Sequence, residues 1–120
     1  MAKILVVDDS KSMRDLLTHI LVANNHEVIV ASDGKEAHEL AQTMAFNIAL
    51  IDYNMPNMNG IKLIGKLREM DAYKFTPLVM VTTETDEYRK KKARAAGATG
   101  WLSKPFTDER IMAAVNKLLV

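Results

Sequence analysis

The segment ILVVDDS, residues 4–10, joins four consecutive apolar residues to two carboxylates and a hydroxyl. An apolar run without polar alternation is typical of a strand that is covered on both faces of a parallel sheet. The polar residues after Val7 predict the end of the strand, and Ser10 is of a type that caps helices. This unit of strand, polar turn and helix sets the pattern for the rest of the chain.

The same unit recurs along the sequence. Further apolar runs lie at residues 28–31, 48–51 and 78–81, with a weaker one around 101–102. Four intervening segments carry apolar residues at the spacing of one buried helix face, which predicts that they lie in the core: Met13, Leu16, Leu17, Ile20 and Leu21; Ala37, Leu40, Ala41 and Met44; Ile61, Ile64 and Leu67; Ile111, Val115, Leu118 and Leu119. Residues 85–96 are mostly charged, but they begin with Thr85-Asp86-Glu87 and stop at Gly97, which indicates a helix. This alternation predicts an α/β fold with a doubly wound parallel sheet.

Length and composition limit the function classes. The 120 residues fit one domain, 1–120, and the absence of cysteine excludes disulfides and thiolate metal sites. The longest apolar run, residues 111–115, is far too short to cross a membrane, and no signal-peptide pattern follows Met1. We therefore expect a cytoplasmic protein without membrane insertion.

The net charge of +1 hides an uneven distribution. Residues 89–94 hold five positive charges in six positions, which leaves eleven basic and fifteen acidic residues elsewhere. The run is either a solvated helix face, with i,i+4 pairs Asp86–Lys90 and Glu87–Lys91, or a patch for an acidic protein partner. Nucleic acid is not expected as a partner, because no reader helix or set of stacking aromatics accompanies the run.

Polar residues stand where the predicted strands end. They are Asp8, Asp9, Asp52, Thr82 and Lys104. Each also has a purely structural interpretation: Asp9-Ser10 can cap a helix and Asp52 can belong to a turn. Thr82 can be an ordinary strand-end threonine, and Lys104 a solvated lysine. Because the carboxyl ends of parallel strands meet at one edge of the sheet, we expect all five to converge there.

Three neighbouring carboxylates repel one another, so they require a bound cation or raised pKa values. Mg²⁺ suits an all-oxygen site. An aspartate can itself be the nucleophile of phosphoryl transfer, and Lys104 and Thr82 could neutralise and hydrogen-bond the phosphoryl oxygens. No glycine-rich phosphate loop is present, which argues against a nucleotide-dependent enzyme, and His19, His26 and His38 lack metal-ligand spacing.

These residues also carry a family resemblance that covers essentially the whole chain. The sequence resembles the receiver domain of two-component response regulators, and within that family the stand-alone, CheY-like chemotaxis type. The motifs are Val7-Asp8-Asp9-Ser10, Asp52-Tyr53-Asn54-Met55-Pro56-Asn57-Met58-Asn59-Gly60, Val81-Thr82-Thr83-Glu84, Gly97-Ala98 and Lys104-Pro105-Phe106. The resemblance implies a flavodoxin-like, three-layer sandwich with strand order 2-1-3-4-5.

The resemblance also implies roles for individual residues. Asp52 would accept a phosphoryl group from a phosphohistidine on a sensor histidine kinase. The Mg²⁺ ligands would be Asp8, Asp9, Asp52 and the backbone carbonyl of Asn54.

The remaining implied roles concern the switch and the lifetime of the phosphorylated state. Thr82 and Lys104 would bind phosphoryl oxygens, and Lys104-Pro105 would be a cis peptide. Trp101 occupies the position of the switch aromatic, normally Tyr or Phe. Asn54 and Glu84 would tune self-catalysed hydrolysis, and their residue types imply a short-lived phosphorylated state.

The function implied is a phosphorylation-controlled switch in chemotaxis-type signalling, with no effector domain and no enzymatic turnover beyond accepting and hydrolysing its own phosphoryl group. Its output would be contact with a protein at the face formed by residues 85–96, the strand near 101–102 and the last helix. We expect a monomer, with a phosphorylation-dependent dimer left open. Two alternatives remain: a Mg²⁺-dependent small-molecule phosphohydrolase, and a phosphorylation-independent interaction module on the same fold.

Overall fold

The computed structural model describes residues 1–119 and contains one five-stranded parallel sheet. The strands are β1 (Lys3–Val7), β2 (Glu27–Ala31), β3 (Ile48–Ile51), β4 (Leu78–Thr82) and β5 (Gly100–Ser103). They lie in the order β2-β1-β3-β4-β5, which confirms the predicted topology.

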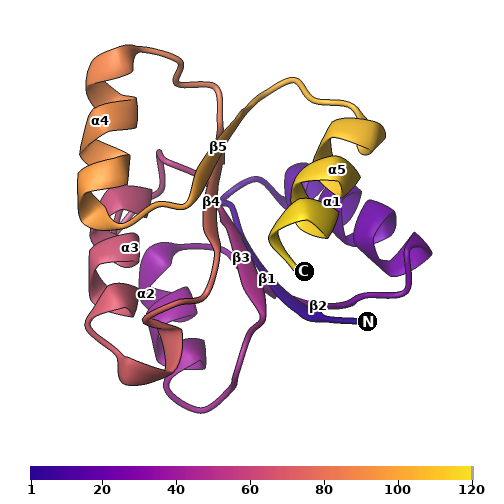
Figure 1. Cartoon of the computed structure of the whole chain (residues 1–120), viewed down its shortest axis with the longest axis horizontal. Helices are drawn as coiled ribbons and strands as arrows, with labels where there is room; N and C mark the ends of the chain where they lie inside the picture. The colour runs from indigo at the N-terminus through magenta and orange to yellow at the C-terminus, as the bar shows by residue number, and fades with distance from the viewer. Residues whose placement is uncertain (120) are drawn as a thin grey trace.

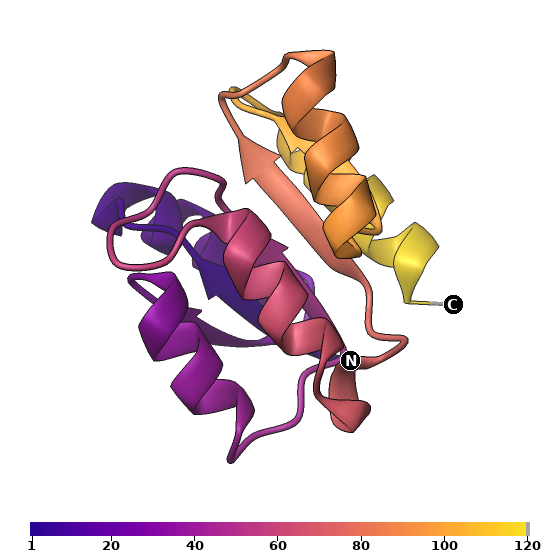
Figure 2. The ribbon, with the colours of Figure 1, turned by 90° about the vertical axis from the view of Figure 1, so that its left-hand side faces the viewer.

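Helices cover both faces of this sheet. They are α1 (Lys11–Ala23), α2 (Gly34–Ala41), α3 (Gly60–Arg68), α4 (Glu87–Ala96) and α5 (Asp108–Leu118), with a short 3₁₀ turn, η1, at Asp71–Tyr73. α1 and α5 lie on one face, and α2, α3 and α4 lie side by side on the other (Figures 1 and 2). The result is the predicted three-layer sandwich.

The core explains why the strands lack polar alternation. Along β1, Leu5 and Val7 belong to the apolar cluster on the α2–α3–α4 side, whereas Ile4 and Val6 belong to the cluster on the α1–α5 side. Every residue of β3 and β4 is buried. A strand that is covered on both faces must be apolar at every position, which is the pattern that the sequence shows.

Each of the five helices begins with a side-chain cap. In every case the capping oxygen accepts a hydrogen bond from a backbone N–H in the first turn: Ser10 from Met13, Asp33 from Glu36, Asn59 from Lys62, Asp86 from Arg89 and Thr107 from Arg110. These caps satisfy N–H groups that have no partner within the helix. The prediction that Ser10 caps the first helix is confirmed.

Several local predictions are wrong. Leu16 and Met44 were expected in the core, but Leu16 is 44% exposed on α1, and Met44 is 39% exposed, beyond the end of α2 at Ala41. The predicted helix at 85–96 begins at Glu87, because Asp86 serves as its cap. It stops at Gly97 as predicted, with φ of 117° in the left-handed region.

The predicted i,i+4 pairs of α4 are also replaced. Arg89 pairs with Asp86 and Lys90 lies 3.9 Å from Glu87, both at i,i+3 spacing. Asp86 stands outside the helix as its cap, so the first-turn Arg89 is the cation that its carboxylate meets.

Arg68, at the end of α3, joins this helix to the turn after α4 and to the segment that begins at η1. Its guanidinium donates to the carbonyl oxygens of Gly97 (3.0 and 2.8 Å), Tyr73 (2.6 Å) and Thr76 (2.7 Å). It makes longer contacts with the Lys74 carbonyl and the Thr99 hydroxyl. Among the described residues, none of these partners is a carboxylate, so Arg68 joins three segments through neutral acceptors.

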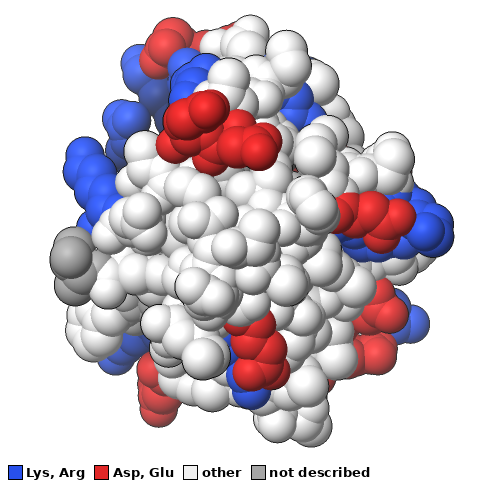
Figure 3. Space-filling view, turned by 90° about the vertical axis from the view of Figure 1, so that its right-hand side faces the viewer, with Lys and Arg blue, Asp and Glu red and all other residues white. Residues whose placement is uncertain are grey.

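The surface differs between the two helical layers. The face formed by α1 and α5 has few charged side chains at its centre, with acidic and basic groups at its margins (Figure 3). Leu16 and Val22 of α1 are among its exposed apolar residues. Within residues 1–119, no helix combines the length and apolar character needed to cross a membrane.

Candidate functional site

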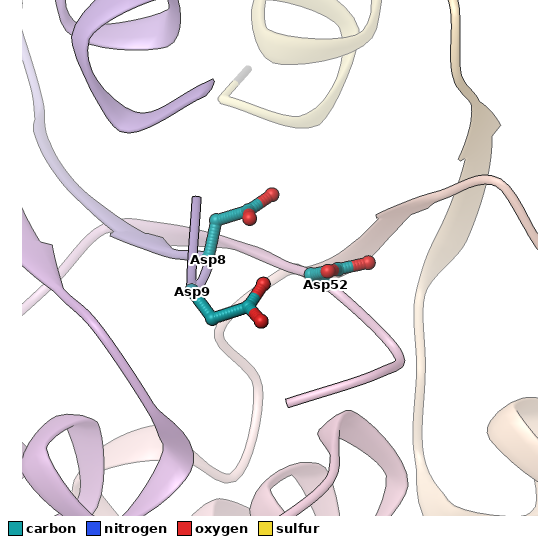
Figure 4. Close-up of side chains that lie close together, drawn as sticks. All are labelled: Asp8, Asp9 and Asp52. Carbon is teal, nitrogen blue, oxygen red and sulfur yellow. The ribbon is translucent and has the colours of Figure 1, made fainter. Parts of the chain in front are cut away.

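Three carboxylates meet where β1 and β3 end. Asp8 and Asp9 follow β1, and Asp52 follows β3 (Figure 4). The backbone N–H of Asp52 donates to the Val7 carbonyl at 2.9 Å, so strand pairing continues to the site. One carboxylate oxygen from each residue lies within 4.8 Å of the others, although Asp8 and Asp52 are buried and Asp9 is exposed. The predicted convergence of these three residues is therefore seen.

Lys104 brings a positive charge to the cluster from the end of β5. Its Nζ lies 2.6 Å from Asp8 Oδ2 and 3.7 Å from Asp52 Oδ1. The backbone N–H of Lys104 donates to the Thr82 carbonyl at 2.9 Å, which holds this residue beside the end of β4. The Lys104–Pro105 peptide is cis.

The pKa of the Asp52 carboxyl is raised above its usual range. Burial is the main cause; the Lys104 ammonium opposes the shift, and the Asp8 carboxylate adds to it. The cluster thus holds three carboxylates and one ammonium, which contacts Asp8 and Asp52, so the ionised cluster has an excess of negative charge. All its candidate ligand atoms are carboxylate oxygens, which fits Mg²⁺ better than a metal that prefers thiolate or imidazole ligands.

The loop after Asp52 is fixed by contacts of both its backbone and its side chains. Asp52 Oδ1 accepts a hydrogen bond from the N–H of Tyr53 at 2.8 Å. Asn57 adopts φ of 69° and donates from Nδ2 to Asp33, the cap of α2, at 3.0 Å. A Cβ at Gly60 would lie 2.3 Å from the Asp52 carbonyl oxygen, so only glycine allows this close approach. These contacts hold Asp52 in place.

Thr82 and Glu84 stand at the neighbouring strand end. Thr82 is fully buried, and its hydroxyl accepts from the Glu84 N–H at 3.4 Å. Glu84 Oε1 accepts from Asn54 Nδ2 at 2.7 Å, which joins the loop after β4 to the loop after β3. The two residues expected to tune hydrolysis are therefore in direct contact.

Trp101 lies on β5, where it pairs with Met80 of β4. It is partly buried against the apolar cluster on the α2–α3–α4 side. Its ring lies 6.4 Å from the Tyr53 ring, and Lys90 Nζ of α4 lies 6.0 Å from its centre. The indole N–H is buried and has no hydrogen-bond partner among the described residues. Trp101 thus connects the basic helix with the residue next to Asp52.

Other contacts at the site carry no sequence signal. Asp8 accepts a hydrogen bond from the Ser10 N–H at Oδ1, and its carbonyl oxygen accepts from Arg14 Nη1 at 2.8 Å. Arg89 contacts both Glu84 and Asp86. The only sequence signal for the Arg14 contact is its position one turn after the Ser10 cap. For Arg89 the only signal is its place in a run of positive charges.

Comparison with known proteins gives a consistent result. Residues 4–116 match the family described as response regulator receiver domain. The chain is 36% identical over 117 residues to the transcriptional regulatory protein SrrA of Staphylococcus aureus, covering 98% of this chain and 47% of SrrA. It therefore spans about half the length of the curated relatives it matches.

Solved structures agree over the full fold. The chemotaxis response regulator CheY4 of Vibrio cholerae superposes with a TM-score of 0.96 at 44% identity, and the match covers 99% of each chain. The receiver domain of the Francisella response regulator 1452 superposes with a TM-score of 0.91 at 30% identity, covering 99% of this chain and 97% of that one.

Proposed function

Because the chain belongs to the response regulator receiver domain family, we propose that Asp52 accepts a phosphoryl group from a sensor histidine kinase with Mg²⁺ and thereby switches a protein-binding surface. One observation carries this proposal. The Lys104 ammonium and three carboxylates surround the same space at the strand ends. Residues 1–120 would act as one receiver domain of a two-component system.

The carboxylates of Asp8, Asp9 and Asp52, with the backbone carbonyl of Asn54, would hold the ion. All these ligands are oxygen atoms, which fits the preference of Mg²⁺. When bound, Mg²⁺ offsets the negative charge of the carboxylates and of the phosphoryl oxygens.

The transfer itself uses the Asp52 carboxylate as nucleophile. One of its oxygens attacks phosphorus, the phosphorus–nitrogen bond of the phosphohistidine breaks, and the electron pair returns to the imidazole. The Lys104 ammonium, now 3.7 Å from Asp52 Oδ1, would pair with a phosphoryl oxygen. The same acyl phosphate is later hydrolysed, so the chain turns over no substrate other than its own phosphoryl group.

The switch would begin at Thr82. Its hydroxyl would bond a phosphoryl oxygen, and the shift would pass to Trp101 on the adjacent strand. Such a charge-driven change biases two arrangements of one packed element. The buried indole N–H of Trp101 has no partner in the arrangement described, so a second position that offers an acceptor would be favoured.

The output surface would be the α4–β5–α5 face. There, Lys90 lies against Trp101, and Lys91 and Lys92 follow it on α4. This positive charge suits an acidic protein partner, and nucleic acid would not be a partner. The resting form would be a monomer. The similarity to CheY4 supports a role in chemotaxis-type signalling.

Phosphorylation of the purified protein tests this proposal. The protein is incubated with Mg²⁺ and acetyl phosphate, or with beryllium fluoride as a mimic, while intact mass and Trp101 fluorescence are followed. The wild type is expected to gain one phosphoryl group and to change its fluorescence, whereas Asp52→Asn does neither. Continuous hydrolysis of general phosphate esters would support a phosphohydrolase, and no response would support a passive interaction module.

A further inference from the structure

Glu84 shares its carboxylate between the phosphoryl site and the start of α4. Oε1 accepts from Asn54 Nδ2 at 2.7 Å, and Oε2 lies 3.4 Å from Arg89 Nη1. Asn54 lies two residues after Asp52, and Glu84 two residues after Thr82. Through this one side chain, Arg89 is connected with the loop that carries the acceptor aspartate.

Arg89 is held in place from three directions. Its Nη1 donates to Asp86 Oδ2 at 2.6 Å, it contacts Glu84, and its guanidinium carbon lies 5.8 Å from the centre of the Tyr53 ring. Asp86 is the cap of α4, so the first turn of the helix directs Arg89 back toward the β4–α4 loop. The hydrogen bond and charge of Asp86 raise the pKa of Arg89, which stays a cation at every relevant pH.

The position of this cation has an electrostatic consequence. Glu84 places a further carboxylate against Asn54, two residues after Asp52, and an incoming phosphodonor is itself an anion. Arg89 offsets the charge of Glu84 and restricts the positions of its carboxylate. Without Arg89, Glu84 would hold the Asn54 amide less firmly and would repel an anionic donor more strongly.

We propose that Arg89 is a positioning residue of the phosphoryl site, which holds Glu84 against Asn54 and thereby sets the rates at which Asp52 gains and loses its phosphoryl group. The rate part rests on the proposed function, whereas the contact part does not. Arg89, Glu84 and Asp86 side chains are between 27% and 44% exposed, so the effect should be modest and sensitive to salt.

The contact is tested without metal or donor. The side-chain amide signals of Asn54 are recorded by NMR for the wild type, Arg89→Ala and Arg94→Ala. Arg94 is a matched control, because it is exposed on the same helix and does not belong to the Glu84 network. We expect the Asn54 amide to shift in Arg89→Ala and not in Arg94→Ala. An unchanged amide in Arg89→Ala overturns the proposal.

The rates are tested by a double-mutant cycle with Glu84→Gln, using acetyl phosphate and the less charged phosphoramidate as donors. Arg89→Ala is expected to slow phosphorylation by acetyl phosphate about two- to five-fold, with a smaller effect for phosphoramidate. Arg89→Lys keeps the charge and should fall between wild type and Arg89→Ala. In the Glu84→Gln background the effect of Arg89→Ala should vanish, because the charge through which it acts is gone.

Equal effects of Arg89→Ala with and without Glu84 would overturn the proposal, since they would show that Arg89 acts only on helix α4. The same conclusion follows if Arg94→Ala slows the reaction as much as Arg89→Ala. A wild type that takes up no phosphoryl group overturns the function proposed for Asp52, and the Asn54 amide signals then decide on the contact alone.

Discussion

Two partly buried cations, Arg68 and Lys104, sit at different places in the fold and have opposite surroundings. Arg68, at the end of α3, donates to carbonyl oxygens of Gly97, Tyr73 and Thr76. Lys104 stands at the carboxyl ends of the strands and faces the carboxylates of Asp8 and Asp52. A cation that contacts only neutral acceptors contributes to the stability of the fold. A cation among more carboxylates than it can neutralise leaves negative charge that a bound metal ion can offset.

The comparison predicts that Arg68 matters for stability and not for chemistry. Arg68→Ala removes donors from partly buried carbonyls in two segments, at Tyr73 and Thr76 and at Gly97, and should lower the free energy of unfolding by about 3 kcal/mol. Denaturant unfolding measures the loss. Arg68→Lys keeps the charge without the planar fork, so it should fall between the two. Below its own transition temperature the Arg68→Ala protein should still take up one phosphoryl group.

An unchanged midpoint in Arg68→Ala, or a stable protein that has lost phosphorylation, would break this division between the two cations. Arg94→Ala serves as the control, because Arg94 is an exposed residue of α4.

The charged cluster should gain stability from a divalent cation. Mg²⁺ bound only by the folded state adds about 1.4 kcal/mol when its concentration is about ten times the dissociation constant. The shift in Tm with Mg²⁺ measures this. Asp9→Asn should reduce the shift, because Asp9 is the exposed member of the cluster and its loss leaves the buried pair intact. Glu87→Gln, which removes an exposed acidic group outside the cluster, should not. Equal shifts in both variants would show that Mg²⁺ acts by general screening.

The smallest predicted effect is the pH dependence of stability that comes from His26. His26 Nδ1 accepts a hydrogen bond from the Ala2 N–H at 3.2 Å, and burial, with the nearby N-terminal charge, lowers the pKa of His26. The fold therefore favours the neutral imidazole. Its contribution to stability is present above the usual pKa of histidine, about 6.5, and is lost as the pH falls below that value.

Wild type should thus lose Tm relative to His26→Gln as the pH is lowered from 8 to 5, because glutamine offers an acceptor that does not titrate. The wild-type and variant curves running parallel over that range would mean that His26 takes up its proton equally in the folded and unfolded chains, and would contradict the lowered pKa.

Sequence reasoning was strongest where one local rule decides the outcome. Buried parallel strands must be apolar throughout, and the residues that end them must meet at one edge, so the parallel sheet and the cluster of Asp8, Asp52 and Lys104 were predictable. The strand order followed only from the family resemblance. The exposure of Leu16 was not predictable, because helical spacing shows which residues share a helix face but not how much of that face its neighbours cover.

Contacts between segments that are distant in the sequence could not be predicted, because residue type does not show which segments meet. The carbonyl oxygens that Arg68 meets leave no trace in residue type, since every residue has one. Arg89 looked like one of five equivalent charges, and only the cap at Asp86 gives it a direction. A run of like charges in a sequence does not reveal which member faces a site.

The central claim is that Asp52, and not its neighbours, carries the phosphoryl group. The protein is phosphorylated with acetyl phosphate and Mg²⁺, treated at once with borohydride, which reduces an aspartyl phosphate to homoserine, and digested for mass spectrometry. We predict homoserine at position 52 and unmodified aspartate at positions 8 and 9. Homoserine at position 8 or 9, or none at position 52 in a protein that has gained a phosphoryl group, would contradict the account.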